Sequence, residues 1–313
     1  MDQTNFSVTT YFIVNGFSDH PGLQPVISIM VLCIYLVTIG GNMTILLLVC
    51  QDQQLHTPMY FFLCNLSILD ICCSTNNLHN IIISAITGDN TISVSGCLLQ
   101  IFIFLSLTCA ELLILATMGY DRYVAICNPL YYSMIMTSPI CTLLAMSCWI
   151  LGALESIQIV LELFRFTCYR SNIINHFFCD IMPVMKLTCS DTTFLDLYIL
   201  TLGVLVSAFS PFLLTVISYF FIIVSILKIK SSTGRHKAFY TCSSHLTVFM
   251  LLYTTLAIQY MRPHTLINLD SNKLISLFNT AAMPLLNPLI YSLRNKDVKA
   301  SFSRRFRVIK LKL

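Results

Sequence analysis

Seven long stretches of this 313-residue chain contain almost no charged residues. Each is long enough to cross a lipid bilayer as a helix, which takes roughly 20 apolar residues. The stretches cover residues 26–50, 58–85, 95–120, 139–161, 197–227, 238–261 and 274–292. We expect helices rather than the strands of a barrel, because a backbone in lipid must satisfy its own hydrogen bonds and the stretches show no strict apolar–polar alternation. The sequence therefore predicts an all-α membrane protein, a bundle of seven transmembrane helices.

The composition excludes a soluble globular domain. Hydrophobic residues make up 56% of the chain, charged residues make up 10%, and the mean hydropathy is +0.78. Average soluble domains are far less apolar and carry more charge. We therefore expect an N-terminal segment at residues 1–25, a seven-helix domain at residues 26–292 and a basic tail at residues 293–313.

Lysine and arginine are unevenly distributed between the predicted connections. The connections on the side of the N-terminus hold five of them, and those on the opposite side hold thirteen. The positive-inside rule then places the N-terminus outside and the tail in the cytoplasm. The tail alternates cations with apolar residues, so we expect a short amphipathic helix on the anionic inner leaflet, with lipid rather than nucleic acid as its partner. Outside the membrane, Asn5 begins an Asn-Phe-Ser sequence that can accept a glycan.

Four of the fourteen cysteines fall in segments that are predicted to face the oxidising exterior. They are Cys97, Cys168, Cys179 and Cys189. Four cysteines allow three pairings, and spacing alone does not choose among them. Most of the other cysteines lie in the apolar stretches, where a thiol behaves as a small apolar group.

Three acidic residues, Asp70, Glu111 and Glu155, interrupt the apolar stretches. An ionisable residue within a membrane is costly and marks a functional candidate. Two interpretations of Asp70 and Glu111 are open: they supply oxygen ligands to a hard cation such as sodium, or they are protonated and hydrogen-bonded between helices. The same pair supports an alternative function, an ion- or proton-coupled small-molecule transporter, although no internal repeat relates the two halves of the chain. Neither a His-Glu-x-x-His motif nor a nucleophile elbow is present, so we expect no enzyme.

Short motifs near the ends of the predicted helices narrow the choice. The third stretch is followed by DRY (residues 121–123), the fourth holds Trp149, the fifth holds Pro211 and Tyr219, and the seventh holds NPLIY (residues 287–291). This set resembles the rhodopsin-like G-protein-coupled receptors.

Four longer segments point to one branch of those receptors. They are LHTPMYFFLCNLSILD (55–70), MGYDRYVAICNPLYY (118–132), KAFYTCSSHL (237–246) and PLLNPLIYSLRNKDVK (284–299). In this order, and spread over nearly the whole chain, they resemble the signature segments of the vertebrate olfactory receptor family. The chain departs from the family pattern at Gly119, Tyr240 and Asn279, where the family usually has alanine, serine and tyrosine.

The resemblance implies a multi-pass receptor of the plasma membrane that binds a small odorant within the bundle. It also implies activation of the olfactory stimulatory G protein, which raises cyclic AMP, and no cofactor apart from a bound sodium ion. The ligand site would lie among the outer halves of helices three, five, six and seven and would comprise Phe104, Leu105, Thr108, Cys109, Ser207, Tyr253, Leu256, Tyr260 and Thr280. Because the outer half of helix three carries no aspartate, we expect a small, neutral and mostly apolar ligand.

The resemblance implies roles for several further residues. The activation switch and G-protein contact would comprise Asp121, Arg122, Tyr123, Tyr219, Lys237, His245, Asn287, Pro288 and Tyr291. At rest Asp121 would hold Arg122, which activation frees. Asp70 and Glu111 would face Asn42 and Asn287 in the middle of the bundle, where relatives hold sodium or water. The external cysteines would pair as Cys97 with Cys179 and Cys168 with Cys189.

Two further features of the sequence allow more than one interpretation. Cys242 and His245, three residues apart, could share a helical face as metal ligands, although a helix end that packs and contacts the G protein is the favoured interpretation. Glu155 lies about one and a half turns beyond Trp149. If Glu155 faces the bundle, it would favour an amine or a strong hydrogen-bond donor among ligands. The alternative is a glutamate that reaches the outer interface or bonds to a neighbouring helix.

Overall fold

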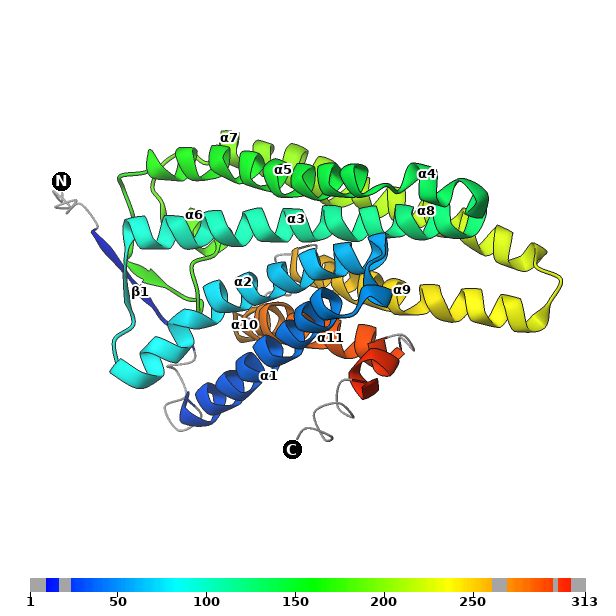
Figure 1. Ribbon diagram of the computed structural model, residues 1–313. Coiled ribbons are helices and arrows are strands. Elements are labelled where there is room, and N and C mark those ends of the chain that lie inside the picture. The colour runs from blue at the N-terminus through cyan, green and yellow to red at the C-terminus, as the bar shows by residue number, and fades with distance from the viewer. Residues whose placement is uncertain (1–9, 17–23, 261–268, 295–297, 305–313) are drawn as a thin grey trace, which may run out of the picture.

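The chain forms an elongated helical bundle in the computed structural model, which describes residues 10–16, 24–260, 269–294 and 298–304 (Figure 1). Among the described residues, seven helical segments are long and apolar enough to cross a membrane. They are Gln24–Gln51, Pro58–Thr87, Val94–Cys127, Ser138–Phe164, Thr193–Lys228, Ser232–Gln259 and Lys273–Tyr291. The predicted seven-helix bundle is confirmed.

The fifth and seventh membrane segments consist of more than one helical element, whereas each of the first four is a single helix. These four are α1 (Gln24–Gln51), α2 (Pro58–Thr87), α3 (Val94–Cys127) and α5 (Ser138–Phe164). The fifth runs through α7 (Thr193–Tyr198), η3 (Ile199–Phe209) and α8 (Ser210–Lys228), the sixth is α9 (Ser232–Tyr260), and the seventh runs through α10 (Leu269–Leu277), η5 (Phe278–Ala282) and α11 (Met283–Arg294). The connections hold η1 (Gln53–Leu55), η2 (Pro129–Tyr131), α4 (Tyr132–Ile135) and α6 (Ile181–Leu187). Both η3 and η5 are π-helices, a wide and rare form that is frequent at functional sites.

Proline marks the start of several helices. Pro58, Pro129, Pro139 and Pro211 occupy the first or second position of α2, η2, α5 and α8. A helix has no internal acceptor for the N–H groups of its first turn, so the missing N–H of proline does no harm there. At its other end, α2 stops at Gly88, whose φ of 73° is the left-handed conformation that favours glycine.

A small three-stranded sheet covers one end of the bundle, called here the outer end. The strand β1 (Tyr11–Val14) lies between β2 (Thr91–Ser93), to which it is antiparallel, and β3 (Ile173–Ile174), to which it is parallel. Figure 1 shows β1 at the end of the molecule away from the connection between α8 and α9. The end that holds Arg122 is called the inner end. The sequence predicted no strands, and these short ones form only because folding brings three distant segments together.

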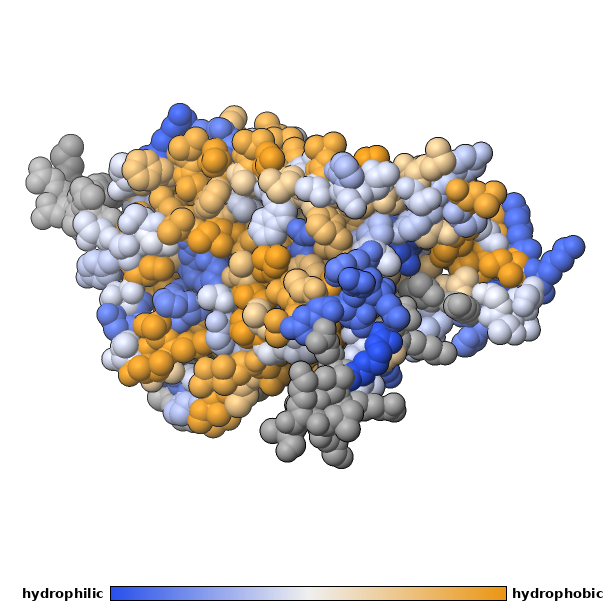
Figure 2. Space-filling view, in the orientation of Figure 1, coloured by the Kyte–Doolittle hydropathy of each residue, from blue (hydrophilic) through white to orange (hydrophobic). Residues whose placement is uncertain are grey.

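Hydrophobic side chains both fill the bundle and cover its flanks. The main core includes the fully buried Leu66 of α2 and Leu115 of α3. Figure 2 shows hydrophobic side chains over much of one flank, with hydrophilic side chains toward the end where α8 and α9 meet. Leu36, Leu154 and Phe220, on three different helices, are more than half exposed. A surface of this kind is suited to lipid rather than water.

The helices approach most closely where a glycine removes the side chain. A Cβ atom on Gly152 of α5 would lie 2.5 Å from the backbone oxygen of Ser106 in α3. A Cβ atom on Gly41 of α1 would lie 3.2 Å from the Pro288 side chain of α11. Small residues commonly permit such close backbone contact between membrane helices.

Residues 298–304 form a short helix after the seventh membrane segment. Val298 and Ser301 are buried, and Arg304 pairs with Asp52 in the first inner connection at 2.6 Å. This helix corresponds to the beginning of the predicted amphipathic tail, and residues 305–313 lie outside the described part.

Candidate functional site

A charged cluster occupies the inner end of α3. Arg122 donates through Nε to Asp121 Oδ2 at 2.9 Å, and its terminal nitrogen Nη2 donates to the same oxygen. Tyr132 of α4 donates its hydroxyl to the other oxygen, Asp121 Oδ1, at 2.8 Å. Asp121 is fully buried, and only 12% of the Arg122 side chain is exposed. The carboxylate of Asp121 is therefore satisfied by two donors, one on its own helix and one on the adjoining connection.

Tyr132 was missed as a functional candidate, although it ends the quoted segment 118–132. Burial, and then the neighbouring Asp121 carboxylate, raise the pKa of Tyr132, so its hydroxyl keeps the proton that it donates. No local pattern predicts that α4 folds back against the end of α3, because this depends on the turn at η2.

A second contact set joins three membrane segments at the inner end. Fully buried His245 of α9 lies with Nε2 2.9 Å from the Leu115 carbonyl of α3 and with Nδ1 2.8 Å from the Tyr219 hydroxyl of α8. A carbonyl only accepts, so Nε2 donates to Leu115. The Tyr219 hydroxyl also lies 3.1 Å from the Cys242 carbonyl. These residues are called here the inner brace.

The inner brace corrects one interpretation from the sequence. Both ring nitrogens of His245 have protein partners, so neither is left for a metal ion shared with Cys242. In the described part of the chain, no group of three or more His, Cys, Asp or Glu side chains is arranged to hold a metal.

The other predicted switch residues lie around these two clusters. Tyr123 packs its ring near Phe221, with ring centroids 6.0 Å apart. Pro288 lies inside α11 and contacts α1 at Gly41. Tyr291 is fully buried and interacts electrostatically with Asp70 and Arg122. The side chain of Lys237 lies outside the described residues.

A polar cluster lies in the middle of the bundle. Asn287 of α11 donates to both oxygens of Asp70 in α2, at 3.0 and 3.1 Å, and Glu111 of α3 interacts with both residues. Asn42 of α1 donates to the carbonyl of Pro284 at 3.1 Å. Three buried oxygens, Glu111 Oε1, Asn287 Oδ1 and Asn42 Oδ1, receive no hydrogen bond from the described residues. Buried oxygens without donors are unusual, and they are the groups that a hard cation or water would satisfy.

The predicted ligand residues of α3, η3 and α9 gather in the outer half of the bundle. Tyr253 donates its hydroxyl to the Ala208 carbonyl of η3 at 3.1 Å. Cys109 and Ser207 both donate to the carboxylate of Glu155. Glu155 thus joins two of the predicted residues and bonds to neighbouring helices.

The remaining predicted ligand residues lie on α3, on α9 and on the seventh membrane segment. Leu105, Thr108 and Leu256 are partly buried. Thr280 of η5 is buried and donates to the Ser276 carbonyl of its own segment at 2.8 Å. The side chain of Tyr260 lies outside the described residues. Asn279, one of the departures from the family pattern, donates to Gln259 of α9 and so links the sixth and seventh segments.

The long connection between α5 and α7 closes the outer end over these residues. Disulfides join Cys97 to Cys179 and Cys168 to Cys189, the two pairs that the resemblance implies. The ring of Phe178 packs edge-on against Phe104, with centroids 5.2 Å apart. This contact places the connection directly above the predicted ligand residues of α3. Asn5 lies outside the described residues.

Comparison with known proteins decides the family. Residues 31–308 match the sequence profile of a family described as olfactory receptor. The chain is 43% identical to mouse olfactory receptor 5M5 over 302 residues, which are 96% of this chain and 95% of that one. It is also 43% identical to human olfactory receptor 13C2 over 319 residues, covering 98% of this chain and 99% of the other. The chain belongs to the olfactory receptor family.

The structural comparison agrees with this assignment. The crystal structure of squid rhodopsin superposes with a TM-score of 0.73 at 18% sequence identity, covering 92% of this chain and 82% of that chain. The resemblance to the family is confirmed: this olfactory receptor is a multi-pass membrane protein of the G-protein-coupled receptor class, and it is not an enzyme. The assignment favours the receptor over the transporter alternative.

Sequence reasoning missed a buried cation at the outer end of this olfactory receptor. Lys273 is 1% exposed and donates to the backbone carbonyls of Asn15, at 3.1 Å, and Gly16. Burial, and then the Lys273 ammonium, lower the pKa of nearby His176 to about 3. His176 is therefore neutral at physiological pH and does not repel the lysine. Lys273 lies next to the predicted boundary of the seventh stretch, where a lysine is expected to face water, so the sequence did not mark it as buried.

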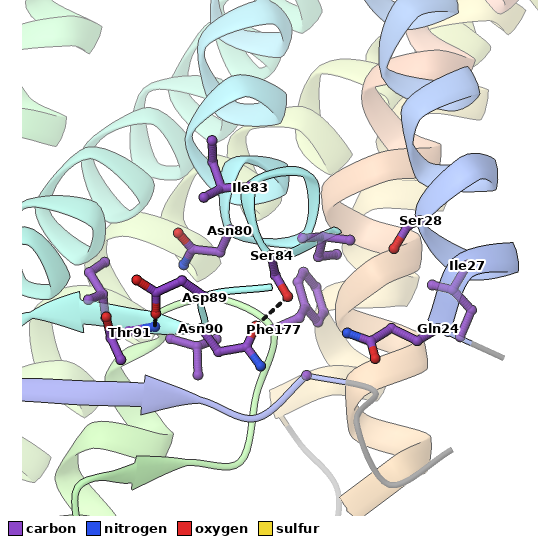
Figure 3. A pocket seen from close by; sticks show the side chains of 14 residues that line it. Gln24, Ile27, Ser28, Asn80, Ile83, Ser84, Asp89, Asn90, Thr91 and Phe177 are labelled. Carbon is purple, nitrogen blue, oxygen red and sulfur yellow. Dashed lines mark hydrogen bonds between the residues drawn. The ribbon is translucent and has the colours of Figure 1, made fainter. Parts of the chain in front are cut away.

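An open cleft lies at the outer ends of α1 and α2 (Figure 3). Gln24, Ser28, Asn80 and Ser84 line it with polar groups, and Phe177 lines it with a ring. Figure 3 shows Ser84 bonded to Asn90 at its edge. The cleft is built from other helices than those that carry the predicted ligand residues of the olfactory receptor.

Gly119, another departure from the family pattern, faces the inner brace. A Cβ atom there would lie 3.4 Å from Thr215 and 3.6 Å from the ring of His245, which are ordinary contact distances. The alanine usual in the family would therefore fit, and glycine leaves a small gap between α3, α8 and α9.

Proposed function

We propose that this olfactory receptor binds a small odorant in the outer half of the bundle, between α3, η3, α9 and η5. Binding would pass a rearrangement to the olfactory stimulatory G protein, which raises cyclic AMP. The observation that carries the proposal is the pair of contact sets at the inner end, in which Arg122 is held by Asp121 and the inner brace joins α3, α8 and α9.

Each of these contact sets can exchange its partners. Arg122 is charged at all physiological pH values and needs a partner or water near the membrane interface. If α9 moves away from α3, His245 loses the Leu115 carbonyl, and the inner end opens beside Arg122. Such a pair of arrangements is a two-state element, which a ligand biases only through its different affinities for the two states.

The predicted ligand residues are mechanically connected to this element. Tyr253 and His245 both lie on α9, eight residues apart, which corresponds to about 12 Å along a helix. Ser207 lies in η3, on the same membrane segment as Tyr219 of α8. A ligand that moves the outer parts of α9 and η3 therefore acts on two of the three membrane segments that the inner brace joins. Lys237, at the inner end of α9, is assigned to the G-protein contact.

Replacing Arg122 with alanine is expected to abolish the odorant-dependent rise in cyclic AMP, because the G protein then loses the cation that activation releases. The assay uses cells that express the full chain with the olfactory stimulatory G protein and are exposed to a mixed panel of small odorants. Arg165→Ala is the matched control, since Arg165 is exposed and pairs with Glu162 at the outer end. It should leave the response unchanged.

The same cells test the proposed location. Antibody staining of an N-terminal epitope in intact cells reports the plasma membrane and the outward N-terminus, and a glycosidase-sensitive mobility shift that Asn5→Gln removes reports the glycan. A full response from Arg122→Ala at equal surface amounts would refute the switch, and a silent intact chain at the surface would refute the coupling.

A sodium ion in the polar cluster is part of the proposal. Asp70, Glu111 and the unpaired oxygens of Asn287 and Asn42 supply the oxygen ligands that such a cation takes. Asp70, Glu111 and Asn287 would hold such an ion between α2, α3 and α11, and its single charge would offset one of the two carboxylate charges. The alternative is a cluster of protonated carboxyl groups, which needs no ion.

Sodium is expected to raise the unfolding temperature of the purified receptor above its value in potassium at equal ionic strength. An ion at roughly 10 to 100 times its Kd stabilises a protein by about 1–3 kcal/mol, or a few degrees. Asp70→Asn should remove the difference between the two salts, whereas Asp191→Asn, in the exposed outer connection, should retain it. Identical melting of the intact receptor in both salts would favour the protonated cluster.

A further inference from the structure

Glu155 is turned into the bundle rather than toward the membrane surface. Its Oε2 accepts hydrogen bonds from Cys109 of α3, at 3.2 Å, and from Ser207 of η3. Its backbone oxygen accepts from Tyr198 of α7 at 3.3 Å. The glutamate therefore lies between three membrane segments, in contact with two of the predicted ligand residues.

The membrane segment opposite Glu155 has an unusual form. Ser207 belongs to η3, an eleven-residue π-helix whose wide turns are frequent at functional sites. The next residue, Ala208, accepts a hydrogen bond from Tyr253 through its carbonyl. Gly203, one turn earlier in η3, presents no side chain, and a Cβ atom there would lie only 3.7 Å from Glu155 Oε1. The π-helix thus places the Ser207 hydroxyl and the bare backbone of Gly203 beside the carboxylate.

The carboxylate is incompletely satisfied by the protein. Both side-chain donors reach Oε2, and Oε1 receives no hydrogen bond within the described part of the chain. No described lysine, arginine or histidine forms an ion pair with it. A carboxylate accepts about four hydrogen bonds and is costly inside a membrane unless it is paired. The missing partner is a positively charged hydrogen-bond donor.

We propose that Glu155 Oε1 is the anchor for a basic nitrogen, so that small aliphatic amines with an apolar tail are ligands of this receptor. The inference rests on the proposed function and specifies its ligand class. A protonated amine would donate to Oε1 and share the charge that Cys109 and Ser207 only partly stabilise. Its tail would extend along α3 toward Leu105 and Phe104, under Phe178. The absence of an aspartate on the outer half of helix three predicted neutral ligands, but the acid is supplied by the neighbouring helix.

The test compares amines with alcohols of the same chain length, hexylamine with hexanol and octylamine with octanol. Glu155→Gln retains the shape and the acceptor oxygen but removes the charge. It is expected to raise the half-maximal concentration for the amines by about tenfold or more, the size of one lost ion pair, and to leave that for the alcohols nearly unchanged. The matched control is Glu162→Gln, because Glu162 lies on the same helix but pairs with Arg165.

Two results would overturn the anchor. One is an equal loss of potency for amines and alcohols in Glu155→Gln, which would assign Glu155 to helix packing. The other is an intact receptor that responds to the alcohols but not to the amines. If Glu155→Gln does not reach the surface, Ser207→Ala provides the second variant: it keeps the carboxylate, so the preference for amines should persist, and its loss would count against the anchor.

A binding measurement separates this inference from the proposed signalling. Octylamine should raise the unfolding temperature of the purified full-length receptor without any G protein, and Glu155→Gln should remove that rise. Stabilisation by octylamine without a cyclic AMP response would retain the anchor and refute the signalling. Failure of octylamine to stabilise the receptor, when octanol does, would refute the anchor alone.

Discussion

Cys97→Ser is expected to keep most of the receptor from reaching the cell surface. The bond from Cys97 to Cys179 closes a sequence separation of 82 residues, and both cysteines are fully buried. In the chain-entropy model, a crosslink of this span raises the free energy of the unfolded chain by about 4 kcal/mol. This is a large part of the stability of an ordinary domain. The bond also fixes the backbone N–H of Cys179, which donates to Gln100 Oε1 at 2.9 Å. The measurement is the ratio of surface to total receptor, from staining of intact and permeabilised cells.

Two other cysteines calibrate this result. Cys168→Ser removes a disulfide that spans only 21 residues, for which the same relation gives about 3 kcal/mol. The fall in surface receptor should therefore be smaller than for Cys97→Ser. Cys33→Ser changes an exposed free thiol on α1 and should behave as the intact chain. Equal surface ratios for Cys97→Ser and Cys33→Ser would show that the long disulfide contributes little to folding.

Gly152→Ala is expected to destabilise the receptor although it adds a single methyl group. The new Cβ atom would lie 2.5 Å from the Ser106 oxygen and 3.2 Å from the Ala110 nitrogen, and both are backbone atoms that cannot move aside alone. Helices α3 and α5 must therefore separate, and overpacking of this kind typically costs about 1–3 kcal/mol. The measurement is the unfolding temperature of the purified receptor, which should fall by several degrees.

Gly40→Ala is the matched control for this change. A Cβ atom on Gly40 of α1 would meet no atom within 4 Å, so the substitution tests only the helix propensity. It should be neutral or slightly stabilising, since glycine is less favourable than alanine within a helix by up to about 1 kcal/mol. An unfolding temperature for Gly152→Ala equal to that of Gly40→Ala would mean that α3 and α5 adjust without loss.

The sequence located the membrane helices well because lipid imposes a simple rule on charge. The third apolar stretch spans residues 95–120, and α3 spans Val94–Cys127. The difference arises because the helix continues past the apolar stretch, where Asp121 and Arg122 are paired with each other. Absence of charge therefore predicts where a helix crosses the membrane, but not where it ends.

The details of the candidate site depend on how helices are rotated against one another, which no local pattern encodes. The sequence alone allowed Glu155 either to face the bundle or to reach the outer interface or a neighbouring helix. The close contact at Gly152, three residues earlier, fixes how α5 faces α3, and this rotation brings Glu155 to Cys109 and Ser207. The π-helix η3 was likewise unpredicted, because its sequence is as uniformly apolar as an ordinary membrane helix. Tyr132 reaches Asp121 only through the turn at η2.

The inner brace has a consequence for the basal activity of the receptor, that is, its signalling without a ligand. In the apolar interior, the His245 N–H has the Leu115 carbonyl as its partner, and leaving such a buried donor unpaired costs about 1–3 kcal/mol. Separating α9 from α3 without a ligand would incur this cost, which corresponds to a factor of roughly 5–150 in the ratio of silent to signalling receptors. One hydrogen bond between two helices thus sets much of the basal signalling that an odorant response must exceed.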